Sequence, residues 1–555
     1  MTPRRFLVGF VMVALVAAAL VIDPSSPRRP VDVDVVRAAA FAPVATADDA
    51  SSSTWYCVAG TAAKGGAADH RVVVANPTDR TAEGRVEIFP TEGDPVIVPL
   101  QVAAGSRESI AVGTKVEATF AAAVIELTAG GVVAEHEVLG TAGWDMGRCA
   151  SAPSTAWYFA WGRTAGAANL SFALLNPFPE DAVVDLTFET EEGFVAPTAL
   201  EGMLVPARRL VVVDVTEQVS VRARVATTVS TRAGRIVAER IQTVVGADGV
   251  SAVDLSLGAP APAKVWNFAE GRADAATGEQ FSVFNPTDEP AEVEIVIERS
   301  GAGTGGAPAP FEIRVPAGGA AQIVLNQEAR IALPVRHTTT VRSVNGVPVV
   351  AERVTATGSI AKVLFGDLGV ETSFATTTTT AAPTTTSTTS TTTTAPPAAP
   401  STTTTTATTT TTTTTTTPAP AVVTGGLVVL PTGFSATLGS PVVAGRWVAA
   451  TGGRDDLVDA SLSVLNVTTA ELGLTVTAWD KGRATPLSAP AKIGPGQRLE
   501  IPLVLAKGAT GYLVVVEATG AIVVDRLQPS ARPAEIAVLP AIPTPGGGTP
   551  PVAAS

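Results

Sequence analysis

The 555-residue chain contains few of the residues with which proteins carry out chemistry. It has two cysteines and three histidines, charged residues stop at 16%, and aromatic residues reach only 5%. Two cysteines cannot form a structural zinc site by themselves. No Gly-x-Ser-x-Gly, His-Glu-x-x-His or Walker pattern is present. The sequence therefore predicts a protein that is not an enzyme, with no catalytic, cofactor-binding or metal-binding residues.

Basic clusters are missing as well. The net charge is −13, and Lys and Arg gather only around the first apolar stretch. A nucleic-acid partner needs a concentrated basic surface, so we expect no nucleic-acid binding. The chain is instead rich in Val and Ala, with 50 Gly and 42 Pro. This composition favours strands and turns over helices.

A strand that runs into an Asn turn occurs four times, and Pro follows the Asn in three of the copies. A Trp precedes each Asn by 21 residues in the first copy and by 19 in the others. Three landmarks at near-constant spacing indicate internal duplication. The repeats open at Trp55, Trp157, Trp266 and Trp447, and their turns contain Asn76, Asn176, Asn285 and Asn466. They close on an acid followed by a base: Glu135-His136, Glu239-Arg240, Glu352-Arg353 and Asp525-Arg526.

Each repeat divides into about seven short strands. In the third repeat we expect them at 265–268, 281–284, 291–298, 311–315, 321–325, 337–344 and 347–354. Seven strands in about 100 residues, with turn signals between them, are typical of a β-sandwich, whereas propeller blades repeat at about 40–50 residues. The predicted fold class is all-β: tandem immunoglobulin-like β-sandwich repeats, three plus one, after an N-terminal transmembrane helix and with a disordered Thr-rich linker.

The N-terminus carries an uncharged apolar run, Phe6–Ile22, behind two arginines. Its length lies between a signal-peptide core and a full membrane span. We expect a signal anchor that holds the protein in the cell membrane as a single-pass protein with the C-terminal bulk outside. The alternative is a cleaved signal peptide and a secreted protein.

Composition divides the rest of the chain. Residues 375–421 are almost entirely Thr with Ala, Pro and Ser, which buries too little apolar surface to fold. This stretch is either a glycosylated stalk or a bare linker. The predicted segments are 1–23 anchor or signal peptide, 24–53 flexible spacer, 54–152 repeat 1, 153–260 repeat 2, 261–374 repeat 3, 375–421 stalk, 422–539 repeat 4 and 540–555 disordered tail.

Cys57 and Cys149 bracket the first repeat. In an exported protein they are expected to form a disulfide, and the alternative is two separate buried thiols. According to the chain-entropy model, a bridge of this span would raise the free energy of unfolding by about 4–5 kcal/mol.

Several motifs suggest chemistry but have a structural interpretation. His136 aligns with an Arg in the other three repeats, which favours a structural role. Gly301–Gly306 matches a phosphate-binding pattern, yet a strand rather than a helix follows it. Asp455, Asp456 and Asp459 lack the oxygen-rich loop of a calcium site. The sequons at Asn169 and Asn466 are short enough to occur by chance. The opening Trp residues are expected in the core, with sugar stacking as the alternative.

The Trp55-Tyr-Cys57 opening, the Asn-Pro-Thr turns and the Val-Ala-Glu-Arg closing motif resemble an actinobacterial family. Its members are large secreted or membrane-anchored proteins known only as a domain of unknown function. The resemblance covers Trp55–Phe374, with the fourth repeat as a diverged extra copy, and it implies no activity.

The function we expect is a non-enzymatic cell-envelope surface protein, an array of modules that scaffolds or spaces components outside the membrane. One alternative is a module that binds envelope glycan or protein through loops or exposed aromatic residues such as Trp161. A second is an accessory subunit of a cell-envelope enzyme. The membrane, through Phe6–Ile22, and cell-envelope glycan or protein are the candidate partners.

Overall fold

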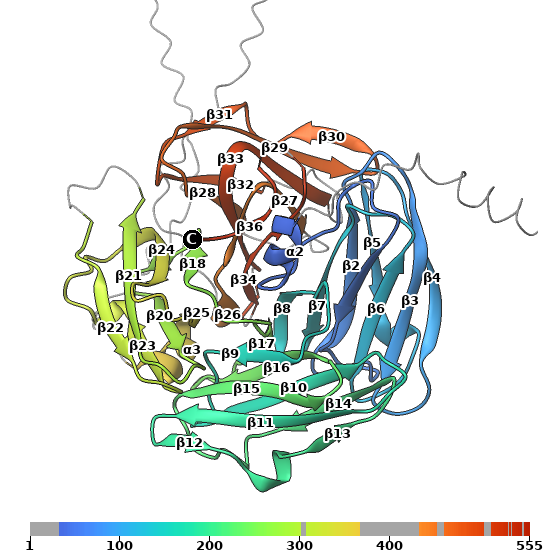
Figure 1. Ribbon diagram of the computed structural model, residues 1–555, viewed down its shortest axis with the longest axis horizontal. Coiled ribbons are helices and arrows are strands. Elements are labelled where there is room, and N and C mark those ends of the chain that lie inside the picture. Colours follow the sequence, from blue (N-terminus) through green and yellow to red (C-terminus); the bar gives the residue numbers. More distant parts are fainter. Residues whose placement is uncertain are drawn as a thin grey trace, which may run out of the picture.

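The computed structural model describes residues 33–300, 307–366, 432–451, 460–503, 512–530, 532–533, 535–546 and 549–555. Antiparallel strands dominate these residues, and they form four modules of two packed sheets each, arranged in a ring (Figure 1). The prediction of an all-β chain of β-sandwich modules is therefore confirmed.

The first two modules are continuous in sequence. Module 1 comprises β1 (Ser53–Cys57), β2 (Asp69–Asn76), β3 (Ala82–Pro90), β4 (Val96–Val102), β5 (Ser106–Ala111), η1 (Val112–Thr114), β6 (Ala121–Leu127), β7 (Val133–Gly140) and β8 (Gly143–Arg148). Module 2 comprises β9 (Ala156–Phe159), β10 (Ala168–Asn176), β11 (Ala182–Thr190), β12 (Gly193–Val195), η2 (Thr198–Leu200), β13 (Met203–Val205), β14 (Arg209–Asp214), β15 (Val225–Ala233), β16 (Val237–Val245) and β17 (Ser251–Leu257).

The last two modules lie on either side of the Thr-rich stretch. Module 3 comprises β18 (Val265–Phe268), β19 (Arg272–Ala273), β20 (Thr277–Phe284), β21 (Ala291–Arg299), β22 (Phe311–Val315), β23 (Ala320–Val324), η3 (Leu325–Gln327), β24 (Val335–Ser343), β25 (Val350–Thr357), α3 (Gly358–Phe365) and β26 (Gly433–Leu438). Module 4 comprises β27 (Val442–Thr451), β28 (Ser461–Asn466), β29 (Leu472–Asp480), β30 (Arg483–Pro486), β31 (Ala491–Ile493), β32 (Arg498–Pro502), β33 (Tyr512–Pro529) and β34 (Ile536–Pro540).

Each module has an outer sheet and an axial sheet, and the axial sheet ends in the strand nearest the centre of the ring. The axial orders are β5-β2-β7-β8, β14-β10-β16-β17 and β23-β20-β25-β26 in the first three modules. In module 4 the long strand β33 belongs to both sheets, and its second half pairs with β28 and β34. The axial sheet therefore has the same order in all four modules.

Alternating side chains explain why these segments are strands of a sandwich. Along β21 the pattern of buried and half-buried residues changes at every position from Ala291 to Ile297. Successive side chains of a strand point to opposite faces, so one face of β21 packs in the core and the other meets water. The opening Trp side chains lie in these cores, as predicted, at 0–1% exposure.

All seven strands predicted for the third repeat are present within a few residues of the expected bounds. Their pairing differs from the immunoglobulin-like arrangement that we expected. In immunoglobulin domains the first strand pairs with the second, whereas β18 pairs with β24 and β20 pairs with β25. Alternation of polar and apolar residues locates strands but does not say which strands become neighbours.

The eighth strand of module 3 comes from beyond the Thr-rich stretch. Gly433–Leu438, assigned from sequence to repeat 4, forms β26 and pairs along its length with β25. Residues 367–431 therefore begin and end on the same module, because Thr357 on β25 lies opposite Gly433 on β26. They form an insertion within module 3 rather than a stalk between two modules.

The fourth module closes the ring, which corrects the expectation of three modules together and one apart. The four axial edge strands contact one another in the order β8, β17, β26, β34 and back to β8 (Figure 1). Trp144 on β8 bridges to Glu535 just before β34. Apolar residues of modules 1 and 4 share one core cluster, which includes Val74 and Val448. Burial of this shared surface favours the closed ring over separated modules.

The chain ends that we expected to be flexible are partly ordered. In the predicted spacer, α2 (Val33–Ala39) lies against β36 (Val552–Ala553), and Ala45 donates a backbone hydrogen bond to Pro543. In the predicted tail, β35 (Ile542–Pro543) and β36 pair with β27. Both segments carry small apolar side chains that pack on module 4, a contact that local composition does not reveal.

Candidate functional site

The residues that close each repeat form the joints between modules. All eight are 0–1% exposed. Because acid and base are adjacent on one strand, their side chains point to opposite faces. The Arg240 guanidinium accordingly lies over Phe159 and Trp161 of its own module. The Glu239 carboxylate instead reaches the preceding module.

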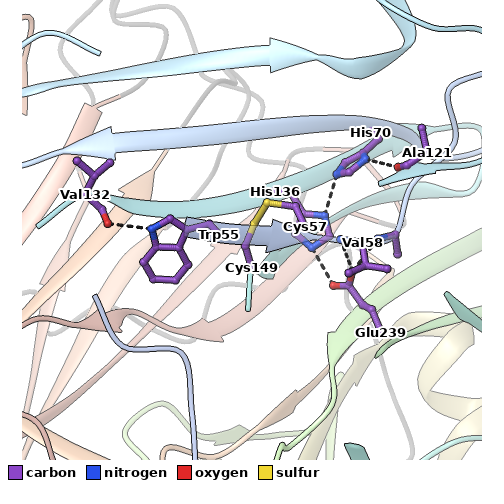
Figure 2. Close-up of a disulfide and its surroundings, with 10 residues drawn as sticks. Trp55, Cys57, Val58, His70, Ala121, Val132, His136, Cys149 and Glu239 are labelled. Atoms are coloured by element: carbon purple, nitrogen blue, oxygen red, sulfur yellow. Dashed lines mark hydrogen bonds and ion pairs between the residues drawn. A yellow bond between two sulfur atoms is a disulfide. The ribbon is translucent and has the colours of Figure 1, made fainter. Parts of the chain in front are cut away.

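The joint between modules 1 and 2 contains His136 and Glu239 (Figure 2). Nε2 of His136 lies 2.8 Å from Oε1 of Glu239. The second oxygen of Glu239 accepts hydrogen bonds from the backbone N–H groups of Ala59 at 2.7 Å and Val58 at 3.3 Å. One carboxylate thus binds both a closing base and the chain that follows an opening Trp.

The joint between modules 2 and 3 repeats this arrangement. Arg240 donates to Glu352 at 2.7 Å, and the other oxygen of Glu352 accepts from the backbone of Ala160 at 3.3 Å. Asp254 on β17 adds a second carboxylate to Arg240 at 3.0 Å. Both terminal nitrogens of this guanidinium therefore pair with carboxylates, whereas its Nε has no hydrogen-bond partner among the described residues.

The joint between modules 4 and 1 closes the ring in the same way. Nη2 of Arg526 lies 2.6 Å from Oε1 of Glu135, and Oε2 of Glu135 accepts from the backbone of Ala450 at 3.1 Å. Burial raises the pKa of Glu135 although Arg526 lowers it, and the same balance of burial and Arg240 raises the pKa of Glu352. The charged forms of these carboxylates are therefore stabilised by the arginine partners rather than by solvent.

The joint between modules 3 and 4 keeps the backbone contacts but not the direct ion pair. Asp525 accepts from Ala269 at 2.9 Å and from Glu270 at 3.1 Å. Arg353 instead approaches Glu279 of its own module at 3.8 Å. The side chain of Arg498 crosses this joint and pairs with Glu270.

His70 extends the joint between modules 1 and 2 into a chain of hydrogen bonds (Figure 2). Its Nδ1 lies 2.7 Å from the carbonyl oxygen of Ala121, and its Nε2 lies 3.1 Å from Nδ1 of His136. Burial first, and then the neighbouring His136, lower the pKa of His70 to about 3. His70 is therefore neutral at pH 7, with its proton on Nδ1 facing the carbonyl.

His136 occupies the position that Arg holds in the other repeats. Its two ring nitrogens lie 3.1 Å from His70 and 2.8 Å from the Glu239 carboxylate, so it links its own module to module 2. This contact agrees with the structural role predicted for it.

Beside His70, a surface groove of about 410 Å³ lies on module 1. Lys64, Asp69, Arg71 and Glu137 are among the residues that line it. Arg71 and Glu137 form an ion pair at 3.3 Å. The charges around the groove therefore largely neutralise one another.

The predicted disulfide is present: Cys57 and Cys149 are joined, with a sequence separation of 92. It connects the first strand of module 1 to the residue after β8. The bond is consistent with a location outside the cytoplasm.

The Asn turns have the predicted geometry in all four repeats. In the third, Oδ1 of Asn285 accepts from the backbone N–H of Thr287 at 3.1 Å, and Nδ2 donates to the carbonyls of Glu289, Val315 and Pro316. The same bonds bury Asn466, so its sequon is inaccessible in the folded protein. Trp161, considered for sugar stacking, is 2% exposed and packs on Phe434.

Four sequence-based predictions concern residues outside those that the structure describes: the membrane anchor Phe6–Ile22, the Gly301–Gly306 loop, the disordered Thr-rich stretch 375–421, and the three aspartates from Asp455 to Asp459. Within the described part of the chain, no helix is both long and apolar enough to cross a bilayer. Nor do the described residues contain three or more His, Cys, Asp or Glu side chains grouped to hold a metal ion.

A second set of joints lies near the axis and could not be recognised from the sequence. Asp145 on β8 accepts from the backbone N–H of Leu255 on β17 at 2.7 Å, and Asp254 accepts from that of Ala436 on β26. Ser435 accepts from Val538 at 3.1 Å. Single polar residues in apolar strands carry no recognisable motif, although Asp145 and Asp254 lie at equivalent positions of the repeat.

Fold and joints together define an all-β protein of four β-sandwich modules closed into a ring by buried polar contacts. No family model matches the chain, and no curated protein matches it. Among solved structures, the crystal structure of Thermotoga maritima 1070 matches 18% of this chain and 84% of its own length, at 18% identity and a TM-score of 0.16. The Anabaena sensory rhodopsin transducer matches 17% and 88%, at 26% identity and a TM-score of 0.15.

A tetra-tandem repeat from the extending region of a large adhesion protein matches over more of the chain. The match covers 86% of this chain and 96% of the repeat, at 10% identity and a TM-score of 0.09. These TM-scores are low, and the ring is defined by its own strand pairings and contacts.

Proposed function

We propose that this protein is a non-enzymatic structural component of the cell envelope that works outside the membrane as a closed ring of four modules. It scaffolds or spaces other envelope components. On this proposal the apolar run Phe6–Ile22 anchors the ring to the membrane, and the chain belongs with the actinobacterial envelope proteins that its repeats resemble.

The observation that carries the proposal is that the closing acids and bases of the repeats pair with each other across the joints between modules. Three closing carboxylates each pair with a base of the preceding module and accept a hydrogen bond from a backbone N–H of that same module. They are those of Glu135, Glu239 and Glu352. All three carboxylates are 0–1% exposed. Groups used in this way hold modules together and are not available to a substrate.

Rigidity is the property that such joints provide. A carboxylate that accepts from a guanidinium and from backbone N–H groups has its geometry fixed by several charge-assisted hydrogen bonds. The disulfide adds a covalent link within module 1 and fits an oxidising location. A rigid ring with few charged residues suits a spacer, which must keep its shape without a ligand.

The proposal can be tested on intact cells that carry the full-length protein. External protease should cleave the ring region and leave a short membrane-bound stub. Purified full-length protein should show no saturable retention on isolated cell-wall glycan. Complete protection from external protease would contradict the location. Saturable glycan retention that a competing soluble glycan abolishes would replace the spacer by a binding function.

A further inference from the structure

The axis of the ring contains a small cavity between the four axial edge strands. Its volume is about 20 Å³. It is lined by residues of β8, β17, β26 and β34, among them Arg148, Ser256, Thr437 and Leu539. All four modules contribute to this cavity, and its size suits a single water-sized group.

Arg148 on β8 is a charged residue at this cavity, and its side chain is buried at 6% exposure. Its Nη1 has no hydrogen-bond partner among the described residues, and no carboxylate of the described chain forms an ion pair with it. A buried charge without a partner is strongly unfavourable. By contrast, Arg240 has both Glu352 and Asp254.

The nearest acids are already committed elsewhere. Glu135 pairs with Arg526 and accepts from Ala450, and Asp525 accepts two backbone hydrogen bonds across the joint of modules 3 and 4. Through space they raise the pKa of Arg148 and so compensate part of its charge, but burial outweighs them and lowers this pKa to about 10.

The hydroxyl groups at the cavity do not satisfy Arg148 either. Ser256 donates to the carbonyl of Ala436, and Thr437 donates to that of Leu438. The guanidinium therefore lacks a partner that brings negative charge.

We propose that the axial cavity binds a small monovalent inorganic anion, chloride, against the guanidinium of Arg148. A water molecule would satisfy one N–H but would bring no negative charge into contact with the guanidinium, whereas chloride does both. Sulfate and phosphate are too large for a space of this size. Chloride at this position contacts strands of all four modules and stabilises the closed ring.

Crystals of the full-length protein grown with sodium bromide test the site directly. Bromide replaces chloride and scatters anomalously. An anomalous peak on the ring axis, beside the Arg148 guanidinium, is the expected result. Ordered water or empty density in the cavity, with no anomalous peak, would overturn the proposal.

Thermal unfolding tests the same site in solution and needs no crystal. At constant ionic strength, replacing gluconate by chloride should raise the Tm of the full chain by on the order of 2–4 °C, and the rise should saturate. Arg148→Met should abolish this rise. Arg342→Met, which removes an exposed arginine paired with Glu294, is the matched control and should keep it.

The outcomes of this second test are distinct. A chloride effect that grows linearly without saturating, or one that is equal in the wild type and in Arg148→Met, would mean that chloride acts on the surface in general and would overturn the proposal. If Arg148→Met does not fold, Arg148→Lys keeps the charge in a smaller group. This variant should retain a chloride response that requires a higher concentration.

Discussion

Removing Arg526 should open the ring at the joint between modules 4 and 1. In Arg526→Met the Glu135 carboxylate keeps its hydrogen bond from Ala450 but loses the guanidinium 2.6 Å away. Both side chains are 0% exposed, so water cannot replace the lost partner. The substitution keeps most of the volume and removes the charge.

The expected cost follows from this burial. Removing one member of a buried ion pair leaves the other uncompensated, at about 3–5 kcal/mol. Burial already raises the pKa of Glu135, so without Arg526 this carboxyl will take up a proton more readily. The loss should therefore be smaller at pH 5 than at pH 8. The double variant Glu135→Leu/Arg526→Met removes both charges and should recover most of the stability.

Chemical unfolding of the wild type, both single variants and the double variant measures the coupling between the two side chains. Arg342→Met, which breaks an exposed pair with Glu294, is the control and should cost about 0–1 kcal/mol. If Arg526→Met costs no more than this control, or if the two single losses simply add in the double variant, the joint does not hold the ring closed.

Three further predictions follow from residues of the repeats. Non-reducing mass spectrometry of the exported protein should show Cys57 linked to Cys149, and their reduction should destabilise the protein by about 4–5 kcal/mol; free thiols would contradict the assignment. The pKa of His70 is about 3 in the folded state and 6.5 ordinarily, so the unfolded chain binds more protons between these values. The contribution of neutral His70 to the free energy of unfolding is therefore present above pH 6.5, and it is lost by up to about 1.4 kcal/mol per pH unit as the pH falls toward 3. In unfolding experiments, the free energy of unfolding of His70→Gln should change less steeply with pH over this range. Asn285→Ala should cost about 2–4 kcal/mol in thermal unfolding because it leaves buried carbonyls unpaired, whereas the exposed neighbour Asp288→Ala should cost almost nothing.

The parts of the fold that could be predicted from sequence depend on local pattern. Alternation along residues 291–298 located β21, and the Asn turns, the buried Trp side chains and the disulfide were all foreseen. Four copies made these signals stronger, because a residue type that recurs in register has a shared structural cause. The repeat also identified His136 as a counterpart of Arg240.

The closure of the ring could not be predicted because its contacts join residues far apart in sequence. Arg526 and Glu135 are separated by most of the chain, and nothing near either one indicates the partner. The Thr-rich stretch added to this difficulty. It interrupts module 3 just before its last strand, so β26 was assigned to the next repeat.

The arrangement of the chain around the Thr-rich insertion offers the most direct test of the closed ring. A specific protease site placed within residues 375–421 divides the chain into two fragments, and the second contains β26 and module 4. Because β26 pairs with β25 and module 4 packs on module 1, the two fragments should remain together in size-exclusion chromatography after complete cleavage, and should separate only in denaturant. Release of the second fragment under native conditions would contradict the ring and restore the arrangement of three modules and a separate fourth.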